Sequence, residues 1–359
     1  MVVTRPVQFA AALYVIIMLW AAAGACNSPR PAPAPAPALA PATPLPAGAL
    51  QVSRALLPVV VGWGAPWAER TATPRPTPRP TAGVRDALIA EVVGFARTRG
   101  VDGAGLRGAS CVVTSMAKTG PGTLADCLTR AGRWITFSKR GRIVLEDDLA
   151  VPSNTTIDAA GAGVELYGHG LTIHRSQNVI IAGLAITECA EDAIQVTEHA
   201  QGVFLTGLVL SACGDGLVDI TDGATDVTLA NSTLRDHSKA MLIGASDGHT
   251  ADAAIWVTIA NTIFATTYRH PMCRYGYVHL DRVTIGPWQG DAVDARLGCR
   301  VLITRSWFVP GPSDKPALAV RLDYGPGSGG AARIVDTHLG GKSAQLGGDV
   351  PDPVYGVLR

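Results

Sequence analysis

A recurring pattern of short apolar strands constrains the fold of this chain more than any other feature of its sequence. Six alternating segments, such as "NVIIAGLAI" and "GVFLTGLVL", recur at intervals of 24, 24, 30, 21 and 23 residues, measured between Val179, Val203, Val227, Val257, Val278 and Val301. Each is followed by a second short strand, and no helix-length pattern lies between them. This spacing is typical of a solenoid and predicts an all-β fold, a right-handed single-stranded parallel β-helix. An antiparallel sandwich is the alternative, but it would not predict such regular recurrence.

The N-terminal region reads as an export signal followed by a spacer. Arg5 precedes an apolar run from Phe9 to Trp20, and the small residues "AAAGAC" end on Cys26. Plain secretion and lipid anchoring at the bacterial cell surface through Cys26 both fit this pattern. Two Pro-rich tracts follow, which predict an extended linker. The predicted organisation is a signal peptide at 1–26, a linker at 27–82, a β-helix lyase domain at 83–345 and a C-terminal tail at 346–359.

The charge balance limits the classes of partner. The chain of 359 residues carries a formal net charge of +1, whereas a nucleic-acid-binding protein normally shows a basic excess. We therefore expect no nucleic-acid partner. We also expect a secreted monomer that needs no obligate protein partner.

Six cysteines remain after Cys26, and an exported protein favours their oxidation. Their spacing suggests partners, because two pairs are separated by 24 and 26 residues, about one coil of the repeat. The predicted disulfides are Cys189–Cys213, Cys273–Cys299 and, for the remaining local pair, Cys111–Cys127. The alternative is that several of these cysteines are buried free thiols.

Charged residues recur around the second strand of successive coils, where a β-helix would place them roughly 4.8 Å apart. The core of a solenoid requires none of them. Asp215 and Asp219 are four residues apart, so in a strand their side chains would point the same way. The cluster therefore predicts three carboxylates beside three cations on one surface: Asp192, Asp215, Asp219, Lys239, Arg269 and Arg274. Carboxylates without a nearby histidine favour calcium over zinc, although each aspartate taken singly also suits a turn.

At these residues the sequence resembles the pectate lyases of polysaccharide lyase family 1. The segments that carry the resemblance are "DGLVDITDGATDVTLANSTLRDHSKAMLIGASD" and "YRHPMCRYGYVH", within a similarity that spans roughly 90–308. The resemblance implies that Asp192, Asp215 and Asp219 bind calcium, that Lys239 and Arg274 bind substrate carboxylates, and that Arg269 is the catalytic base. It also implies β-elimination of α-1,4-linked polygalacturonate, an acidic polysaccharide, to 4,5-unsaturated oligogalacturonates.

Some positions depart from the family pattern, so other functions stay as alternatives. Ala190 stands where many members have a second aspartate, which predicts a weaker calcium site. A pectin lyase would act on methyl-esterified polymer without calcium, using an arginine where this chain retains aspartates. A non-catalytic β-helix that binds polyuronate at the cell surface is a third hypothesis. The "GHG" around His169 resembles a polygalacturonase motif but lacks the surrounding aspartates, so we expect His169 to lie in a turn.

Overall fold

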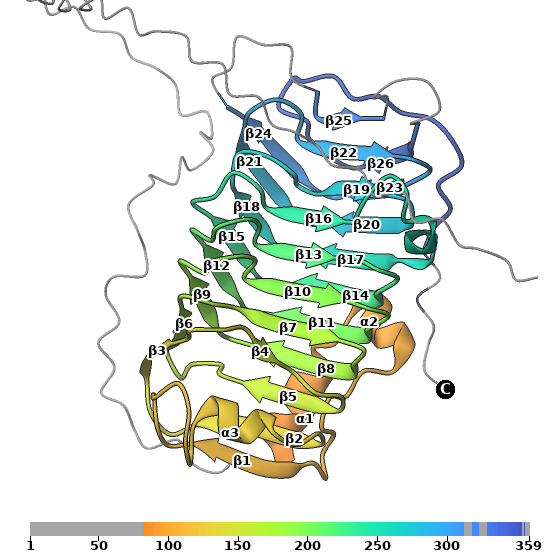
Figure 1. The fold of residues 1–359 in the computed structure, drawn as a ribbon. Coiled ribbons are helices and arrows are strands. Elements are labelled where there is room, and N and C mark those ends of the chain that lie inside the picture. Colours follow the sequence, from red (N-terminus) through yellow and green to blue (C-terminus); the bar gives the residue numbers. More distant parts are fainter. Residues whose placement is uncertain (1–81, 312–317, 323–328, 354, 356–359) are drawn as a thin grey trace, which may run out of the picture. The chain divides into compact units, whose positions relative to one another are not determined.

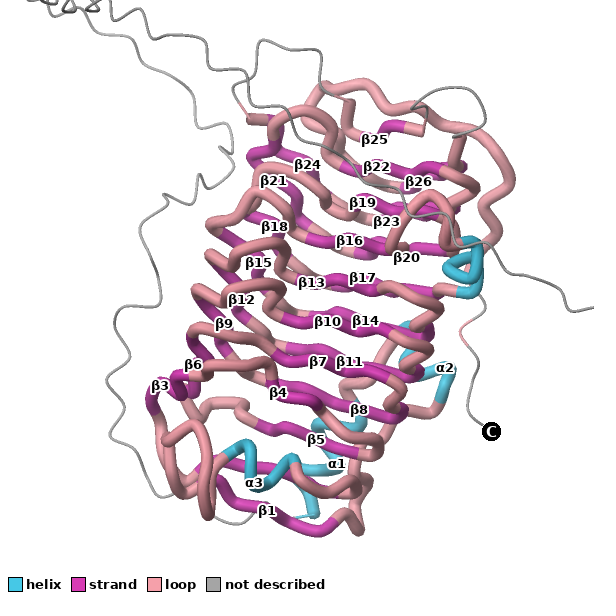
Figure 2. The backbone as a smooth tube through the Cα atoms, viewed as in Figure 1, coloured by secondary structure: helices cyan, strands magenta, loops and turns pink. Residues whose placement is uncertain are grey.

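The computed structural model describes residues 82–311, 318–322, 329–353 and 355 (Figures 1 and 2). Its strands form three parallel sheets of ten, eight and eight strands that run side by side along a β-helix. This confirms the predicted fold class. The predicted signal peptide, the linker up to residue 81 and Cys26 lie outside the described residues. No helix in the described part of the chain is long and apolar enough to cross a membrane.

Each complete coil contributes one strand to each sheet, and neighbouring strands in a sheet come from successive coils; the first sheet has one additional strand at either end. The first sheet contains, in order, β1 (Ala109–Val113), β2 (Arg133–Phe137), β5 (Thr155–Asp158), β8 (Gln177–Ala182), β11 (Gln201–Thr206), β14 (Thr225–Ala230), β17 (Trp256–Ala260), β20 (Tyr277–Asp281), β23 (Arg300–Thr304) and β26 (Ala331–Val335). The second contains β25 (Val320–Arg321), β22 (Val293–Arg296), β19 (Met272–Arg274), β16 (Met241–Ile243), β13 (Val218–Ile220), β10 (Ile194–Thr197), β7 (Leu171–His174) and β4 (Leu149–Ala150). The third contains β24 (Trp307–Pro310), β21 (Thr284–Trp288), β18 (Ile263–Ala265), β15 (Thr233–Arg235), β12 (Val209–Ser211), β9 (Ala185–Thr187), β6 (Val164–Tyr167) and β3 (Gly141–Val144).

The register of the first sheet places the six repeat valines in one row. Val179 pairs with Val203, Val203 with Val227, and the row continues through the later coils to Val301. All six side chains are fully buried in the interior. The sequence period therefore equals the length of one coil, and each coil buries its apolar positions against its neighbours.

A single residue in the left-handed conformation turns each coil from the first sheet to the third. It is glycine in two coils, at Gly183 (φ 72°) and Gly207 (φ 63°), where the lack of a Cβ removes the usual steric cost. Asparagine, which tolerates this conformation, takes the position at Asn231 and Asn261. The Asn261 amide donates to Asn231 Oδ1 at 2.8 Å, so the turns stack as well as the strands.

Short helices precede the regular coils and were not predicted from the sequence. They are α1 (Ala82–Ala90), α2 (Gly94–Arg99) and α3 (Leu124–Leu128), and a 3₁₀ turn, η1, covers Thr250–Ala254. Helices α1 and α2 pack on the outer face of the first sheet, where Leu88 and Ala96 join Trp134, Ile180 and Phe204 in one buried cluster.

The C-terminal segment also packs on the β-helix. Val350 is buried, the Tyr277 hydroxyl donates to the Pro351 carbonyl at 2.7 Å, and the Tyr355 ring lies 5.2 Å from the Phe95 ring. The described part of the predicted tail therefore covers the outer face of the first sheet.

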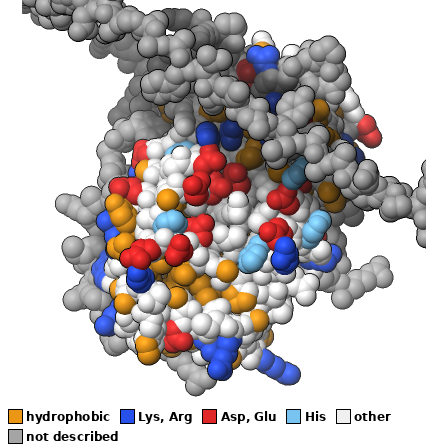
Figure 3. All heavy atoms as spheres, in the orientation of Figure 1, with side chains coloured by type: hydrophobic (Ala, Val, Ile, Leu, Met, Phe, Trp, Pro, Cys, Tyr) orange, Lys and Arg blue, Asp and Glu red, His pale blue; other side chains and the backbone are white. Residues whose placement is uncertain are grey.

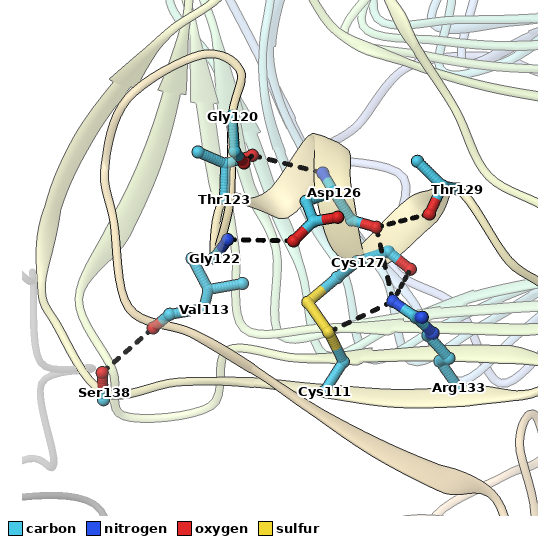
Figure 4. The surroundings of a disulfide bond; sticks show 10 residues. All are labelled: Cys111, Val113, Gly120, Gly122, Thr123, Asp126, Cys127, Thr129, Arg133 and Ser138. Atoms are coloured by element: carbon cyan, nitrogen blue, oxygen red, sulfur yellow. Dashed lines mark hydrogen bonds between the residues drawn. A yellow bond between two sulfur atoms is a disulfide. The ribbon is translucent and has the colours of Figure 1, made fainter.

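All three predicted disulfides are confirmed. Cys111–Cys127 joins β1 to α3, Cys189–Cys213 joins two successive coils, and Cys273–Cys299 joins two coils further along. Figure 4 shows the first of these, beside which Arg133 donates to the Cys127 carbonyl at 3.2 Å. Cysteines about one coil apart in the sequence form disulfides here because the side chains of Cys189–Cys213 and Cys273–Cys299 point between adjacent coils.

Candidate active site

The predicted site residues lie on four successive strands of the second sheet or in the turns leading into them. Strands β10, β13 and β16 are in register, since Ile194 pairs with Val218 and Val218 with Met241. Residues that precede these strands therefore stack at one edge of the sheet, where we find Asp192, Asp215 and Lys239. Asp219 lies within β13, Arg269 precedes β19, and Arg274 ends β19. Figure 3 shows acidic side chains gathered on this face of the molecule, with basic side chains directly above them.

The three aspartates are close enough to perturb one another. Burial is the main cause that raises the pKa of Asp192 to about 6, and the charge of Asp215 adds to it. Burial likewise raises the pKa of Asp219 to about 7, assisted by the charges of Asp192 and Asp215 and opposed by Arg269. The anionic forms of Asp192 and Asp219 are thus destabilised at neutral pH. Groups in this state gain the most stabilisation from a bound cation.

Lys239 holds the third carboxylate in its ionised form. Its ammonium group pairs with Asp215 Oδ1, and this hydrogen bond is the main cause that lowers the pKa of Asp215. About half of the Asp215 side chain is exposed, so this pair lies at the surface of the cluster. The site therefore combines a half-buried pair of aspartates with an exposed ion pair.

The two arginines have different surroundings. Arg269 adopts a left-handed backbone conformation with φ 60°, which is uncommon for a non-glycine residue and occurs at functional positions. Its Nε is buried and has no hydrogen-bond partner among the described residues. Arg274 is largely buried, and its Nε donates to Asp247 Oδ1 at 2.7 Å. The structure therefore brings together Asp192, Asp215, Asp219, Lys239 and Arg269, and it places Arg274 beside Asp247.

Asp215 and Asp219 do not share a strand, contrary to the prediction from their spacing. Strand β13 begins at Val218, so Asp215 lies in the preceding turn. Asp215 instead approaches Asp192, because the turn of Asp215 stacks on the turn that contains Asp192. The backbone N–H of Asp215 donates to the Glu191 carbonyl at 3.2 Å in that stack.

The residues around Asp192 suit a cation such as calcium. Asp192 Oδ1 is buried without a hydrogen-bond partner in the described region. Gly216 lies between these two half-buried carboxylates, and a Cβ built there would sit 2.7 Å from Asp192 Oδ1 and 3.1 Å from Asp219 Oδ1. The missing side chain leaves a small space lined by hard oxygen ligands. Within the described ranges, however, no group of three or more acidic, histidine or cysteine side chains is arranged so that it could hold a metal ion.

Two further groups beside the site were not predicted. Burial and the neighbouring charge of Asp294, which is buried on β22, raise the pKa of Tyr268, the residue before Arg269. The register of the second sheet runs from Asp219 through Leu242 and Met272 to Asp294. Asp294 therefore occupies the same row as Asp219. The similar segments "VDI" and "VDA", in which these two aspartates lie, could have indicated this relation.

The fold and this cluster define a parallel β-helix with a carboxylate-and-cation site on one sheet. Residues 211–323 match the family model for pectate lyase, which spans five of the six predicted site residues and ends beyond β22. The relatives include pectate lyase 4 of Ambrosia artemisiifolia, 33% identical over 49% of this chain and 50% of its own length. Pectate lyase 1 of Chamaecyparis obtusa is 31% identical over 56% of this chain and 61% of its own length. The chain spans about half the length of the curated relatives it matches.

Solved structures show the same fold. The crystal structure of jun a 1, the major allergen from cedar pollen, superposes with a TM-score of 0.65 at 26% identity, over 73% of this chain and 85% of its own. A pectate lyase from Bacillus sp. N165 in complex with trigalacturonate superposes with a TM-score of 0.57 at 20% identity, over 69% of this chain and 87% of its own. The predicted resemblance to the pectate lyases is confirmed.

Proposed function

We propose that this chain is a secreted, calcium-dependent pectate lyase that cleaves α-1,4-linked polygalacturonate by β-elimination. The observation that carries the proposal is the convergence of Asp192, Asp215 and Asp219 with Lys239 and Arg269 on one sheet of a β-helix. The pectate lyase family model and the pectate lyase relatives support the same reaction.

The proposed chemistry gives each residue type a reason. The proton on carbon 5 of a galacturonate lies next to a carboxylate, whose negative charge opposes formation of a carbanion. Bound calcium, held by Asp192, Asp215 and Asp219, would neutralise part of that charge. Lys239 and Arg274 bind uronate carboxylates and fix the sugar ring by charge-assisted hydrogen bonds.

Arg269 is the base in this proposal. Its guanidine nitrogen takes the proton from carbon 5, and the electron pair of that C–H bond forms the double bond between carbons 4 and 5. The glycosidic bond at carbon 4 then breaks, and the leaving oxygen takes a proton from solvent. Because a guanidine accepts a proton only when it is neutral, we expect turnover to increase into the alkaline range.

The three retained aspartates favour a calcium-dependent pectate lyase over a calcium-independent pectin lyase. Export through the segment at 1–26 fits an extracellular polymer, and lipidation at Cys26 would keep the enzyme at the cell surface. A protein that binds the polymer without catalysis would have the same charged surface but would release no unsaturated product.

Product formation tests the proposal. The full chain is incubated with polygalacturonate or with its methyl ester, and the ultraviolet absorbance of unsaturated uronates is followed. We expect activity on polygalacturonate that disappears with chelator and returns with calcium. Full activity in chelator would indicate a pectin lyase, and binding of polygalacturonate without any product would leave only the binding function.

A further inference from the structure

We propose that the Cys189–Cys213 disulfide and His237 form a positioning column that sets Asp192, Asp215 and Lys239 relative to one another. The column contains one residue from each of three successive coils. Each of its members lies two or three residues before one of the site residues. The inference rests on the proposed function, because it assigns these residues a role through the groups that bind calcium and substrate.

The covalent part of the column holds two turns in direct contact. The disulfide keeps the Cα atoms of Cys189 and Cys213 4.4 Å apart. Next to it, the Gly214 N–H donates to the Cys189 carbonyl at 2.7 Å. A Cβ built at Gly214 would lie only 1.9 Å from the Ala190 carbonyl oxygen, so the two turns touch with no space between them. The start of the Asp215 turn is thereby fixed on the turn that leads to Asp192.

His237 extends this link to the third coil. Its Nε2 lies 2.7 Å from the Cys213 carbonyl, which can only accept a hydrogen bond, so Nε2 carries the proton. Nδ1 lies 2.9 Å from the Lys239 nitrogen and 3.0 Å from the Lys239 carbonyl oxygen, so it meets a backbone group of Lys239 whether it accepts or donates. One imidazole therefore ties the backbone of Lys239 to the residue that is disulfide-bonded to Cys189.

The column lies in the turns before the strands, where hydrogen bonds between strands hold the backbone least. Asp192, Asp215 and Lys239 all precede their strands, and of the three only Lys239 pairs with the next coil, through an isolated bridge to Tyr268. The like charges of Asp192 and Asp215 repel one another and favour separation of their turns. A tether through all three turns opposes that separation, and misplacement of such groups by about 1 Å can cost on the order of a hundredfold in rate.

The first test removes the disulfide without leaving a lone thiol. The full-length double variant Cys189→Ser/Cys213→Ser is compared with wild type and with the control Cys111→Ser/Cys127→Ser, whose bond joins β1 to α3. We expect faster amide hydrogen exchange at 190–193, 214–217 and 238–240, and calcium affinity in calorimetry reduced by about tenfold, in the first variant only. Exchange and calcium affinity equal to wild type would overturn the proposal.

The second test addresses His237 without touching the disulfide. The variant His237→Ala loses both contacts, whereas His237→Gln can place its amide N–H near the position of Nε2. Because Lys239 binds substrate, we expect His237→Ala to raise KM for polygalacturonate about tenfold with a change in kcat below about threefold, and His237→Gln to recover part of the loss. A uniform loss of kcat, or no change in KM, contradicts the positioning role. Wild type without any lyase activity would instead reject the proposed function, and hydrogen exchange would still decide the inference.

Discussion

At the scale of single residues, the site depends on which charges are buried and which are paired. Asp192 and Asp219 have raised pKa values because they are buried near one another, whereas Asp215 has a lowered pKa because Lys239 pairs with it. The three carboxylates therefore contribute differently, although the sequence alone gave no reason to distinguish them.

This difference predicts how stability depends on pH. In the folded protein the pKa values of Asp192 and Asp219 rise from 3.8 to about 6 and about 7, so between these limits the folded state binds more protons than the unfolded state. Stability in chelator should therefore fall as the pH rises from 4 to 7. Calcium should raise the Tm by several degrees at pH 8 and by less at pH 5. Thermal scans with chelator and calcium measure both effects.

The matched variant for this prediction is Asp219→Asn, which removes one buried charge but keeps the shape of the side chain. We expect it to be more stable than wild type in chelator at pH 8 and to lose most of the response to calcium. A calcium response that is the same at pH 5 and pH 8 in wild type would contradict the proposed competition between protons and calcium.

The two arginines should separate in their kinetics. Arg269→Lys keeps the charge but moves the proton acceptor, so we expect kcat to fall about a hundredfold with little change in KM. Arg274→Ala removes the group next to Asp247 that we propose binds a substrate carboxylate, so we expect KM to rise as well. Turnover and binding are measured separately on polygalacturonate. If Arg269→Lys turns over like wild type, the assignment of the base is incorrect.

At the scale of secondary-structure elements, the strands could be predicted and the turns could not. The apolar period located the row from Val179 to Val301 because every coil buries the same positions. Asp215 was misplaced because the strand after it is only three residues long, and periodicity does not report where a turn ends. Helices α1 and α2 were missed because they are nine and six residues long and bury only a few side chains.

The turn before β13 gives a prediction about a single methyl group. Gly216→Ala would place a Cβ 2.7 Å from Asp192 Oδ1, which fills the space that we assign to calcium. We expect calcium affinity to fall at least tenfold while the domain stays folded, because the rest of the coil is unchanged. The control is Gly248→Ala, where a Cβ meets no atom within 4 Å. Calorimetry with calcium compares the two variants, and equal affinities would place the cation elsewhere.

At the scale of the whole molecule, each coil is stabilised by its contacts with the coils on either side. Both the site and the N-terminal helices therefore depend on neighbouring strands. The site uses four adjacent strands of the second sheet, from β10 to β19. Helices α1 and α2 instead cover the outer face of the first sheet over several coils. These helices lie outside the repeat, so the period alone could not assign them to the domain.

The position of α1 predicts where the chain can be shortened. Arg85 is buried and donates to the carbonyls of Leu106 at 3.0 Å and Gly108 at 2.9 Å, and its guanidinium lies 4.9 Å from the Trp134 ring. Leu88 covers the same cluster, and its burial alone contributes about 1.5–3 kcal/mol. A variant that starts at residue 82 should retain the unfolding midpoint and lyase activity of the mature protein. A variant that starts at residue 92 should unfold at clearly lower denaturant concentration, because it exposes Trp134. Denaturant unfolding followed by tryptophan fluorescence distinguishes them, and equal midpoints would show that α1 is dispensable for the β-helix.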